Sequence, residues 1–269
     1  MKIKIALLIK SFLLAFVALA LTSAIIITSL YIDRNSLRPE SDETTVLIGI
    51  EDKNKMIALT VINFDPQNSM VSFLPIPDNT LLENSVILQS LYSKENPSAL
   101  IDRVEGIIGT QIHRYAIFST TALVDVIDDM GEFEYLIPHK FVYEGQLHSG
   151  LEKSMDGPLA KAMFTYTEYD MKKVSISDMA MSFIYSFLSK FATSSYSAQL
   201  QDALVSVFED NTIATNLEKE ELISYSQLFS KYTSFSHKEV KLEGTVHNDS
   251  SSSIYFTPNT LYSTKNIFK

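Results

Sequence analysis

The sequence predicts an α/β domain with a mixed central β-sheet flanked by helices on both faces, preceded by one transmembrane helix. Three observations lead to this fold class. An uncharged apolar run occupies residues 11–32, strand-like segments alternate with helical patterns in the first half of the chain, and the second half is mostly helical. About 235 of the 269 residues follow the apolar run, which is ample length for a sizeable core.

The apolar run at 11–32 contains no charged side chain. At about 1.5 Å per residue its helix would be roughly 33 Å long, enough to cross a hydrocarbon core of about 30 Å. Lysines precede the run and mainly acidic residues follow it, so residues 1–10 are expected in the cytoplasm and the rest outside. A cleaved signal peptide and a buried core helix are the alternatives. Thr22-Ser23-Ala24 resembles a cleavage site, but three isoleucines follow it directly, which favours an uncleaved anchor in the cell membrane.

Charge and cysteine content restrict the partners. The whole chain carries a formal charge of −10, of which the first 34 residues contribute +3, so the remainder carries −13. Such an acidic domain lacks the basic footprint of a nucleic-acid-binding protein, so no nucleic acid is expected as a partner. The chain has no cysteine, which excludes disulfides, thiolate metal sites and cysteine nucleophiles.

The expected elements follow the anchor in a clear order. Residues 33–44 are charged, contain Pro39 and lack periodicity, so they are interpreted as a linker before one extracytoplasmic domain at 45–269. Strands are predicted at 45–50, 56–64, 70–76, 115–118 and 132–137, the last ending at Pro138, with a terminal strand-like segment at 254–256. Helices are predicted at 97–108, 121–130, 157–165, 177–192, 198–208 and 218–232. Asp65-Pro66-Gln67-Asn68 has the composition of a tight turn, and Gly109 and Gly131 stand where helices are expected to end.

A search for general catalytic patterns yields little. The five histidines lack metal-ligand spacing, and there is no nucleophile elbow, phosphate-binding loop or dinucleotide fingerprint. The acidic run at 128–132 lacks the alternating oxygen ligands of a calcium loop and is interpreted as a helix end. An aromatic stripe on the helix at 177–192 is expected to belong to the core: Phe183, Tyr185, Phe187, Leu188 and Phe191.

A series of short motifs runs in order through the domain. They are VLIGI at 46–50, INFDP…SMVSFLPIPDNT at 62–80, ALIDRVEGIIGTQIHRY at 99–115, LVDVIDDMGEFEYLIP at 123–138, MDGPLA at 155–160 and NTIATNLEKEEL at 211–222. Together they resemble the LytR-CpsA-Psr family, which consists of anchored phosphotransferases of the bacterial cell envelope. In the last motif the resemblance implies a helix.

The resemblance implies transfer of a glycopolymer from a polyprenyl-pyrophosphate carrier to peptidoglycan. A pyrophosphate is bound best by arginine forks and a divalent cation, and the cation needs carboxylate ligands. The lipid tail needs an apolar channel inside the fold, which a membrane anchor would keep near the carrier.

The sequence departs from the family pattern at the positions that would bind phosphate. Where the family has Pro-Arg-Asp-Thr, this chain has Pro77, Asp78, Asn79 and Thr80. The arginine pair that follows the L-D-G-x-x-A segment in the family corresponds here to Thr165 and Thr167, and the later arginine segment corresponds to residues 175–179, which hold no arginine.

The missing arginines argue against catalysis. Beyond residue 38 the chain has only Arg103 and Arg114, and neither occupies a motif position. Each charge-assisted contact contributes about 1.5–3 kcal/mol, and several are lost together. Asp78 would repel a phosphate, while Lys172 and Lys173 offer point charges rather than forks.

The sequence therefore favours a non-catalytic accessory protein that binds a polyprenyl-phosphate lipid or a glycopolymer precursor. Two alternatives stay open. One is an active phosphotransferase with a remodelled site, in which Glu51, Asp52 and Asp78 hold magnesium. The other is a structural envelope protein that uses the fold for protein contacts only. No catalytic residue is assigned, because Asp78, Asn79, Thr80, Thr165 and Thr167 are all degenerate motif positions.

Overall fold

The computed structural model describes most of the predicted domain. The described residues are 43–77, 79–170, 174–193, 195–210, 212–219, 221, 234–248, 254–259 and 266–268. The predicted anchor at 11–32 lies outside them, as do Asp78, Lys172 and Lys173. Within the described ranges, no helix has the length and apolar character needed to cross a membrane.

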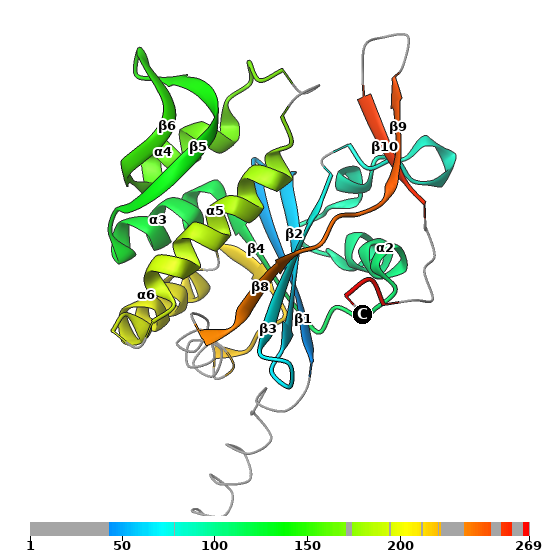
Figure 1. The fold of residues 1–269 in the computed structure, drawn as a ribbon, viewed down its shortest axis with the longest axis horizontal. Helices are drawn as coiled ribbons and strands as arrows, with labels where there is room; N and C mark the ends of the chain where they lie inside the picture. The colour runs from blue at the N-terminus through cyan, green and yellow to red at the C-terminus, as the bar shows by residue number, and fades with distance from the viewer. Residues whose placement is uncertain are drawn as a thin grey trace, which may run out of the picture. The chain divides into compact units, whose positions relative to one another are not determined.

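A six-stranded mixed sheet forms the centre of the fold, with the strand order β7-β4-β1-β2-β3-β8 (Figure 1). Its strands are β1 (Thr44–Asp52), β2 (Lys55–Asp65), β3 (Met70–Ile76), β4 (Arg114–Ser119), β7 (Ile213–Thr215) and β8 (Ser236–Glu239). β1, β2 and β3 form an antiparallel meander, β4 runs parallel to β1, and β8 runs parallel to β3. The mixed sheet predicted from the sequence is therefore confirmed.

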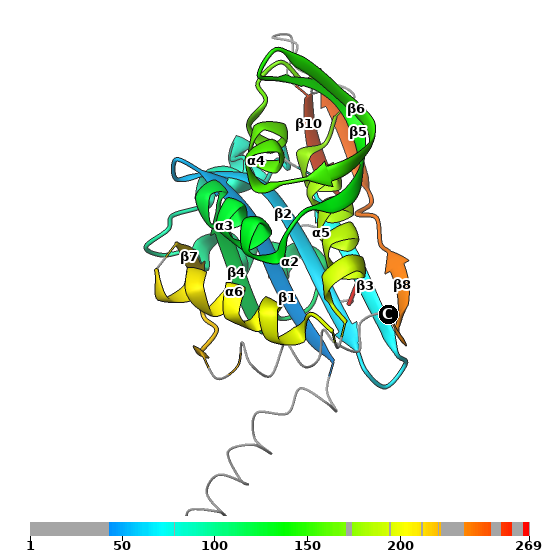
Figure 2. The same cartoon turned by 90° about the vertical axis from the view of Figure 1, so that its left-hand side faces the viewer.

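Helices cover both faces of this sheet, as predicted (Figure 2). The helix α2 (Ser98–Ile108) lies on one face, and α3 (Thr120–Met130), α5 (Ile176–Phe191) and α6 (Ser197–Glu209) lie on the other. Leu47 and Leu59 pack in the cluster with α2, whereas Ile50 and Ala58 pack in the cluster with α3 and α5. Burial on both faces explains why the central strands are nearly continuous apolar runs.

Local side-chain chemistry sets the helix boundaries. The Ser119 hydroxyl accepts a hydrogen bond from the Ala122 amide at 3.0 Å at the start of α3, and Asp156 caps α4 (Gly157–Thr165) by accepting from Leu159 N at 2.8 Å. Gly109 ends α2 with φ of 67°, a left-handed conformation that glycine adopts without a steric penalty. Five of the predicted helices thus agree with the structure to within a residue or two at their ends.

The hairpin of β5 (Phe133–Tyr143) and β6 (Gln146–Met155) corrects one prediction. The strand expected to end at Pro138 continues past it, and β6 was not predicted. Pro138 is tolerated because it lies in a two-stranded sheet near a register irregularity between Ile137 and Phe141. The turn residues Glu144 and Gly145 both have positive φ, 49° and 77°, as two-residue hairpin turns require.

Two further differences concern the last quarter of the chain. Residues 213–215 form the strand β7 against β4, which was not predicted. The terminal strand-like segment is confirmed as β10 (Ile254–Pro258), which pairs with β9 (Gly244–Asn248), a strand that was not predicted. The helix predicted at 218–232 lies mostly outside the described residues.

Candidate functional site

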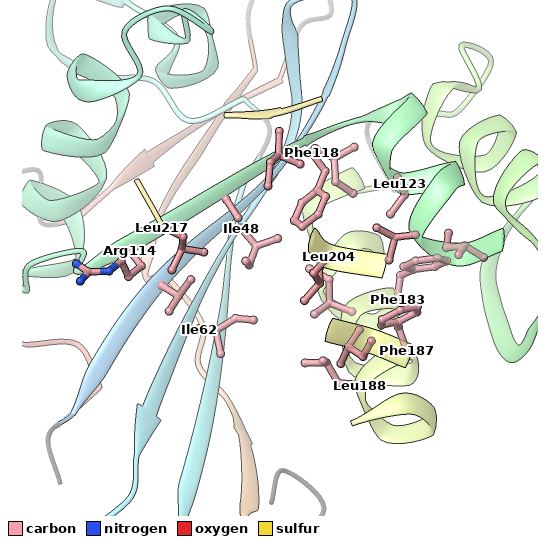
Figure 3. A pocket seen from close by; sticks show the side chains of 18 residues that line it. Ile48, Ile62, Arg114, Phe118, Leu123, Phe183, Phe187, Leu188, Leu204 and Leu217 are labelled. Carbon is pink, nitrogen blue, oxygen red and sulfur yellow. The ribbon is translucent and has the colours of Figure 1, made fainter. Parts of the chain in front are cut away.

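An apolar cavity of about 150 Å³ lies between the sheet and the helices α3, α5 and α6 (Figure 3). Strand residues form one wall and helix residues the other, with Ile213 and Leu217 at the β7 side. Among the described residues that line the cavity, Arg114 alone carries a charge. The apolar lining residues are Val46, Ile48, Ile50, Ile62, Ala116, Phe118, Leu123, Val126, Ile127, Phe183, Ile184, Phe187, Leu188, Leu200, Leu204, Ile213 and Leu217.

Strand alternation and helix periodicity produce the two walls. Every second residue of β1, from Val46 to Ile50, faces the cavity because successive side chains of a strand point to opposite faces. On α5, Phe183 and Phe187 face the cavity and pack edge-on against Phe133, with ring centroids 5.1 and 5.7 Å apart. These edge-on contacts hold the rings in place beside the open volume.

The aromatic stripe predicted as core is therefore only partly core. Phe183, Leu188 and Phe191 are buried as predicted, but Phe183, Phe187 and Leu188 also line the cavity, and Tyr185 is 42% exposed. A one-dimensional pattern does not distinguish a packed interior from a cavity wall, because both require apolar side chains at helical spacing.

The size and chemistry of the cavity suit a short hydrocarbon segment. An engineered cavity of about 150 Å³ lined by Leu, Ile and Phe side chains stays dry and binds ligands as small as benzene. Pockets that enclose a drug-sized ligand are larger, at about 300–1,000 Å³. A long lipid chain would therefore be enclosed here over only part of its length.

Charged residues flank the strands that form the sheet wall of the cavity. Because β1 and β4 run parallel, with Val46 opposite Arg114 and Glu51 opposite Ser119, the amino ends of both strands lie together and so do their carboxyl ends. Arg114 stands at the amino end. Asp52 stands at the carboxyl end of β1, beyond the cavity residue Ile50, whereas Glu51 pairs with Met56 on the face of the sheet that packs against α2.

The predicted metal ligands Glu51 and Asp52 have other partners in the structure. Glu51 is 5% exposed, and its Oε2 accepts a hydrogen bond from Asn54 N at 2.7 Å in the β1–β2 turn. Asp52 Oδ1 accepts from the Thr120 hydroxyl at 2.8 Å at the start of α3. Over the described residues, which do not include Asp78, no group of three or more His, Asp or Glu side chains is placed to hold a metal. The magnesium site at Glu51, Asp52 and Asp78 stays a prediction.

Tyr92 is a buried residue near Glu51, on the face of the sheet that packs against α2. Burial, and then the negative charges of Glu51 and Tyr115, raise the pKa of Tyr92 to about 12. Its hydroxyl has no hydrogen-bond partner among the described residues. Tyr92 is therefore neutral at physiological pH and adds no negative charge beside Glu51.

The motif residues Asn79 and Thr80 hold a loop in place. Thr80 is fully buried, and its hydroxyl donates to Pro77 O at 2.7 Å while its carbonyl accepts from Leu88 N at 2.8 Å. The Asn79 carbonyl accepts from Phe256 N at 3.0 Å, which joins the loop to β10. These contacts give the Thr80 side chain a structural role.

Thr165 and Thr167 bring no positive charge to the end of α4. The Thr165 hydroxyl donates to Lys161 O at 2.8 Å within the last turn of the helix, and Thr167 is exposed. Arg103, by contrast, lies on the exposed face of α2.

The fold is shared with several solved structures. Bacillus subtilis TagV aligns with a TM-score of 0.68 and 19% identity over 81% of this chain and 92% of TagV. A transcriptional regulator of Enterococcus faecalis aligns with a TM-score of 0.65 and 16% identity over 81% of this chain and 82% of its own. Bacillus subtilis TagT aligns at 0.57 and 17% identity over 82% of this chain and 86% of TagT.

No protein-family model and no curated protein matches the chain. The structural likeness is nevertheless consistent across these proteins, and TagV and TagT are LytR-CpsA-Psr proteins. The chain has the fold that the ordered sequence motifs predicted.

Proposed function

We propose that the chain is a divergent LytR-CpsA-Psr protein of the bacterial cell envelope that binds a polyprenyl-linked glycopolymer precursor and does not transfer it. The observation that carries this proposal is the apolar cavity between the sheet and α3, α5 and α6. One solved structure of the same fold is TagT bound to LI-WTA, which supports a ligand-binding role for the fold. The predicted anchor at 11–32 would hold the domain at the outer face of the cell membrane.

Apolar burial would supply the binding free energy. Each buried methylene contributes about 0.8 kcal/mol, so a segment of about five carbons in the cavity yields roughly 4 kcal/mol before the costs of association. A gain of this size gives weak binding, which suits a helper protein that must release its ligand.

The charges argue against phosphoryl transfer at the family's motif positions. Thr165 and Thr167 replace an arginine pair, and β1 ends in Glu51 and Asp52. A pyrophosphate placed there would lose bidentate contacts and gain repulsion from carboxylates.

A substitution that fills the apolar cavity can test lipid binding separately from folding. In Ala116→Phe the new ring would occupy the cavity from the β4 wall, so binding of farnesyl phosphate to the full-length chain is expected to fall at least tenfold. The matched control is Ala198→Phe, the same substitution at an exposed position of α6, which should leave binding unchanged. Circular dichroism establishes that both variants are folded, and Ala116→Leu is a smaller filling variant if Ala116→Phe is not.

Equal farnesyl phosphate binding by the wild type and the folded Ala116 variants would refute the lipid-binding proposal. Turnover of a polyprenyl-pyrophosphate-linked glycan by the full-length chain with magnesium would refute the non-catalytic part. Titration calorimetry with magnesium tests the remodelled metal site, because binding that is lost in Asp78→Asn would favour the active enzyme.

A further inference from the structure

The hairpin of β5 and β6 has an outward face that is largely apolar. Along both strands, exposed side chains alternate with more buried ones that pack on the domain. Of the six large apolar side chains that are exposed in the described part of the chain, four lie on this outward face, and they are 47–65% exposed: Leu136, Val142, Leu147 and Leu151. Apolar side chains gathered on one face, unlike single ones scattered over a surface, are typical of an interaction site.

The four apolar side chains form two cross-strand pairs. Leu136 lies opposite Leu151, and Val142 lies opposite Leu147. Directly opposite residues of an antiparallel pair have Cβ atoms about 4.5–5.5 Å apart, so each pair presents one continuous apolar surface. The outward face therefore has two apolar steps along its length, one near the root of the hairpin and one near its turn.

The charges of the hairpin favour a second protein surface over a membrane as the partner. Its exposed charged residues are two glutamates and two lysines, Glu134, Lys140, Glu144 and Lys153, which sum to zero. Segments that bind anionic lipid carry clusters of 4–8 basic residues, and membrane interfaces are rich in Trp and Tyr. None of the exposed residues of 133–155, a range described throughout, is aromatic. In a domain of charge −13, this neutral face is where two copies approach with the least repulsion.

Two copies can pair their outward faces about a two-fold axis that runs along the hairpin. This axis places β5 of one copy over β6 of the other, so the apolar pairs of the two copies lie over one another. At the root of the hairpin, Glu134 of each copy then meets Lys153 of the other, because both are exposed two residues beyond the first apolar pair. A two-fold axis across the hairpin would instead bring Glu134 over Glu144, which is a contact between like charges.

The direction of the hairpin in the domain favours the same axis. In Figures 1 and 2 the turn of the hairpin lies at the end of the domain opposite to the one where β1 begins. Rotation about an axis along the hairpin keeps this direction, so β1 begins at the same end of both copies. The anchors proposed at 11–32 could then enter one membrane, which would raise the effective concentration of the two hairpins.

We propose that the outward face of the β5–β6 hairpin binds a second copy of this chain, about a two-fold axis along the hairpin. A standard interface buries about 800 Å² per partner, whereas two strands about ten residues long and roughly 5 Å apart offer only about 330 Å². The dimer is therefore weak, with a dissociation constant of about 10 μM or more. Dimerisation through this face depends neither on the apolar cavity nor on the lipid-binding function.

Sedimentation equilibrium of the full-length chain tests the face. The protein is kept in detergent with micelles in large excess over chains, so that two chains do not share a micelle by chance. Leu136→Lys should raise the dissociation constant at least tenfold, because it places a charge within the apolar contact. Val246→Lys is the matched control, since Val246 is 61% exposed on β9, and it should leave the constant unchanged. Circular dichroism establishes that both variants are folded.

Cysteine cross-linking tests the axis, and the absence of native cysteines makes every cross-link assignable. Differently tagged Glu134→Cys and Lys153→Cys chains, mixed and oxidised, should form a disulfide-linked pair several times faster than Glu134→Cys mixed with Glu144→Cys. Exchange of the charges gives a second test of the same contact. Glu134→Lys and Lys153→Glu should each weaken the dimer severalfold, and the double variant should restore it.

The contrary outcomes are equally defined. A wild type that stays monomeric up to about 100 μM would refute the dimer, and equal association of wild type and Leu136→Lys would place the contact elsewhere in the chain. Faster linkage between positions 134 and 144 would refute the axis. In phosphatidylcholine vesicles, a bimane label on Leu147→Cys should shift to the blue as the number of chains per vesicle rises. A shift that does not depend on this number would identify the membrane as the partner and refute the dimer, while farnesyl phosphate binding, measured separately, would be unaffected.

Discussion

Tyr135 on the buried face of β5 joins the hairpin to α5 through its hydroxyl group. The hydroxyl donates to Met179 O at 3.2 Å and lies 2.8 Å from Ser182 Oγ. The side chain is 2% exposed, and burial raises the pKa of Tyr135 from 10.0 to about 12, while the hydrogen bond to Ser182 lowers it. Tyr135→Phe removes this group and keeps the ring.

The stability difference between wild type and Tyr135→Phe should change sign with pH. At neutral pH the variant loses a hydrogen bond that contributes about 1 kcal/mol. The raised pKa means that the folded protein disfavours the phenolate. The stabilisation by the neutral Tyr135 hydroxyl is therefore complete below the pKa of tyrosine in the unfolded chain, and it is lost as pH rises toward the pKa of Tyr135 in the folded protein. By pH 11 the wild type has lost about 1.4 kcal/mol of its free energy of unfolding through ionisation of this tyrosine in the unfolded chain. This loss exceeds the contribution of the hydrogen bond, so the two proteins should be equally stable slightly below pH 11.

Chemical denaturation of the full-length chain at pH 8 and near pH 11 measures this difference. The chain has no tryptophan, so circular dichroism is the suitable signal. Tyr185→Phe is the control, since Tyr185 lies on α5 but is 42% exposed, and it should change stability little at either pH. If Tyr135→Phe is destabilising by the same amount at both pH values, the hydroxyl is not desolvated in the way described.

Three other substitutions test the packing, each by thermal unfolding. Gly157→Ala should cost about 1–3 kcal/mol, because its new Cβ would lie 2.7 Å from the backbone carbonyl oxygen of Val124; an unchanged melting temperature would refute this close approach. Ser119→Ala should cost about 1 kcal/mol through loss of the α3 cap, and Ser119→Asp should retain most of it. Phe141→Ala should cost about 3–5 kcal/mol, whereas Leu136→Ala, on the exposed face of the same strand, should change stability by less than about 0.5 kcal/mol; similar effects would contradict the register of the hairpin.

The parts of the fold that the sequence predicts are those with a local physical cause. The turn at Asp65 forms because its carboxylate accepts from Asn68 N at 3.0 Å, and α2 ends at Gly109 because the backbone there is left-handed. Both signals lie within a few residues. The hairpin strand β6 was missed because only Gly145 marks its turn and because its residues, mostly exposed, lack an apolar alternation.

The site was less predictable because its features depend on contacts between distant residues. Arg114 directly precedes the strand predicted at 115–118, but its position beside the cavity follows from the pairing of β4 with β1 and from Glu221, 107 residues further along the chain. The burial of Thr80 likewise depends on β10. The identity of a single residue does not show which distant residues it will contact in the fold.

The order of strands in the sheet has a consequence for biosynthesis. The two outer strands, β7 and β8, come from late in the chain, whereas the strands that they cover, β4 and β3, are made much earlier. At about 5–20 residues per second, β3 would wait roughly 8 to 30 s after its synthesis before β8 emerges. During that time its hydrogen-bonding edge is available to other chains, since unpaired strand edges promote aggregation. A nascent chain of this protein is therefore expected to depend on chaperones until its last quarter has been translated.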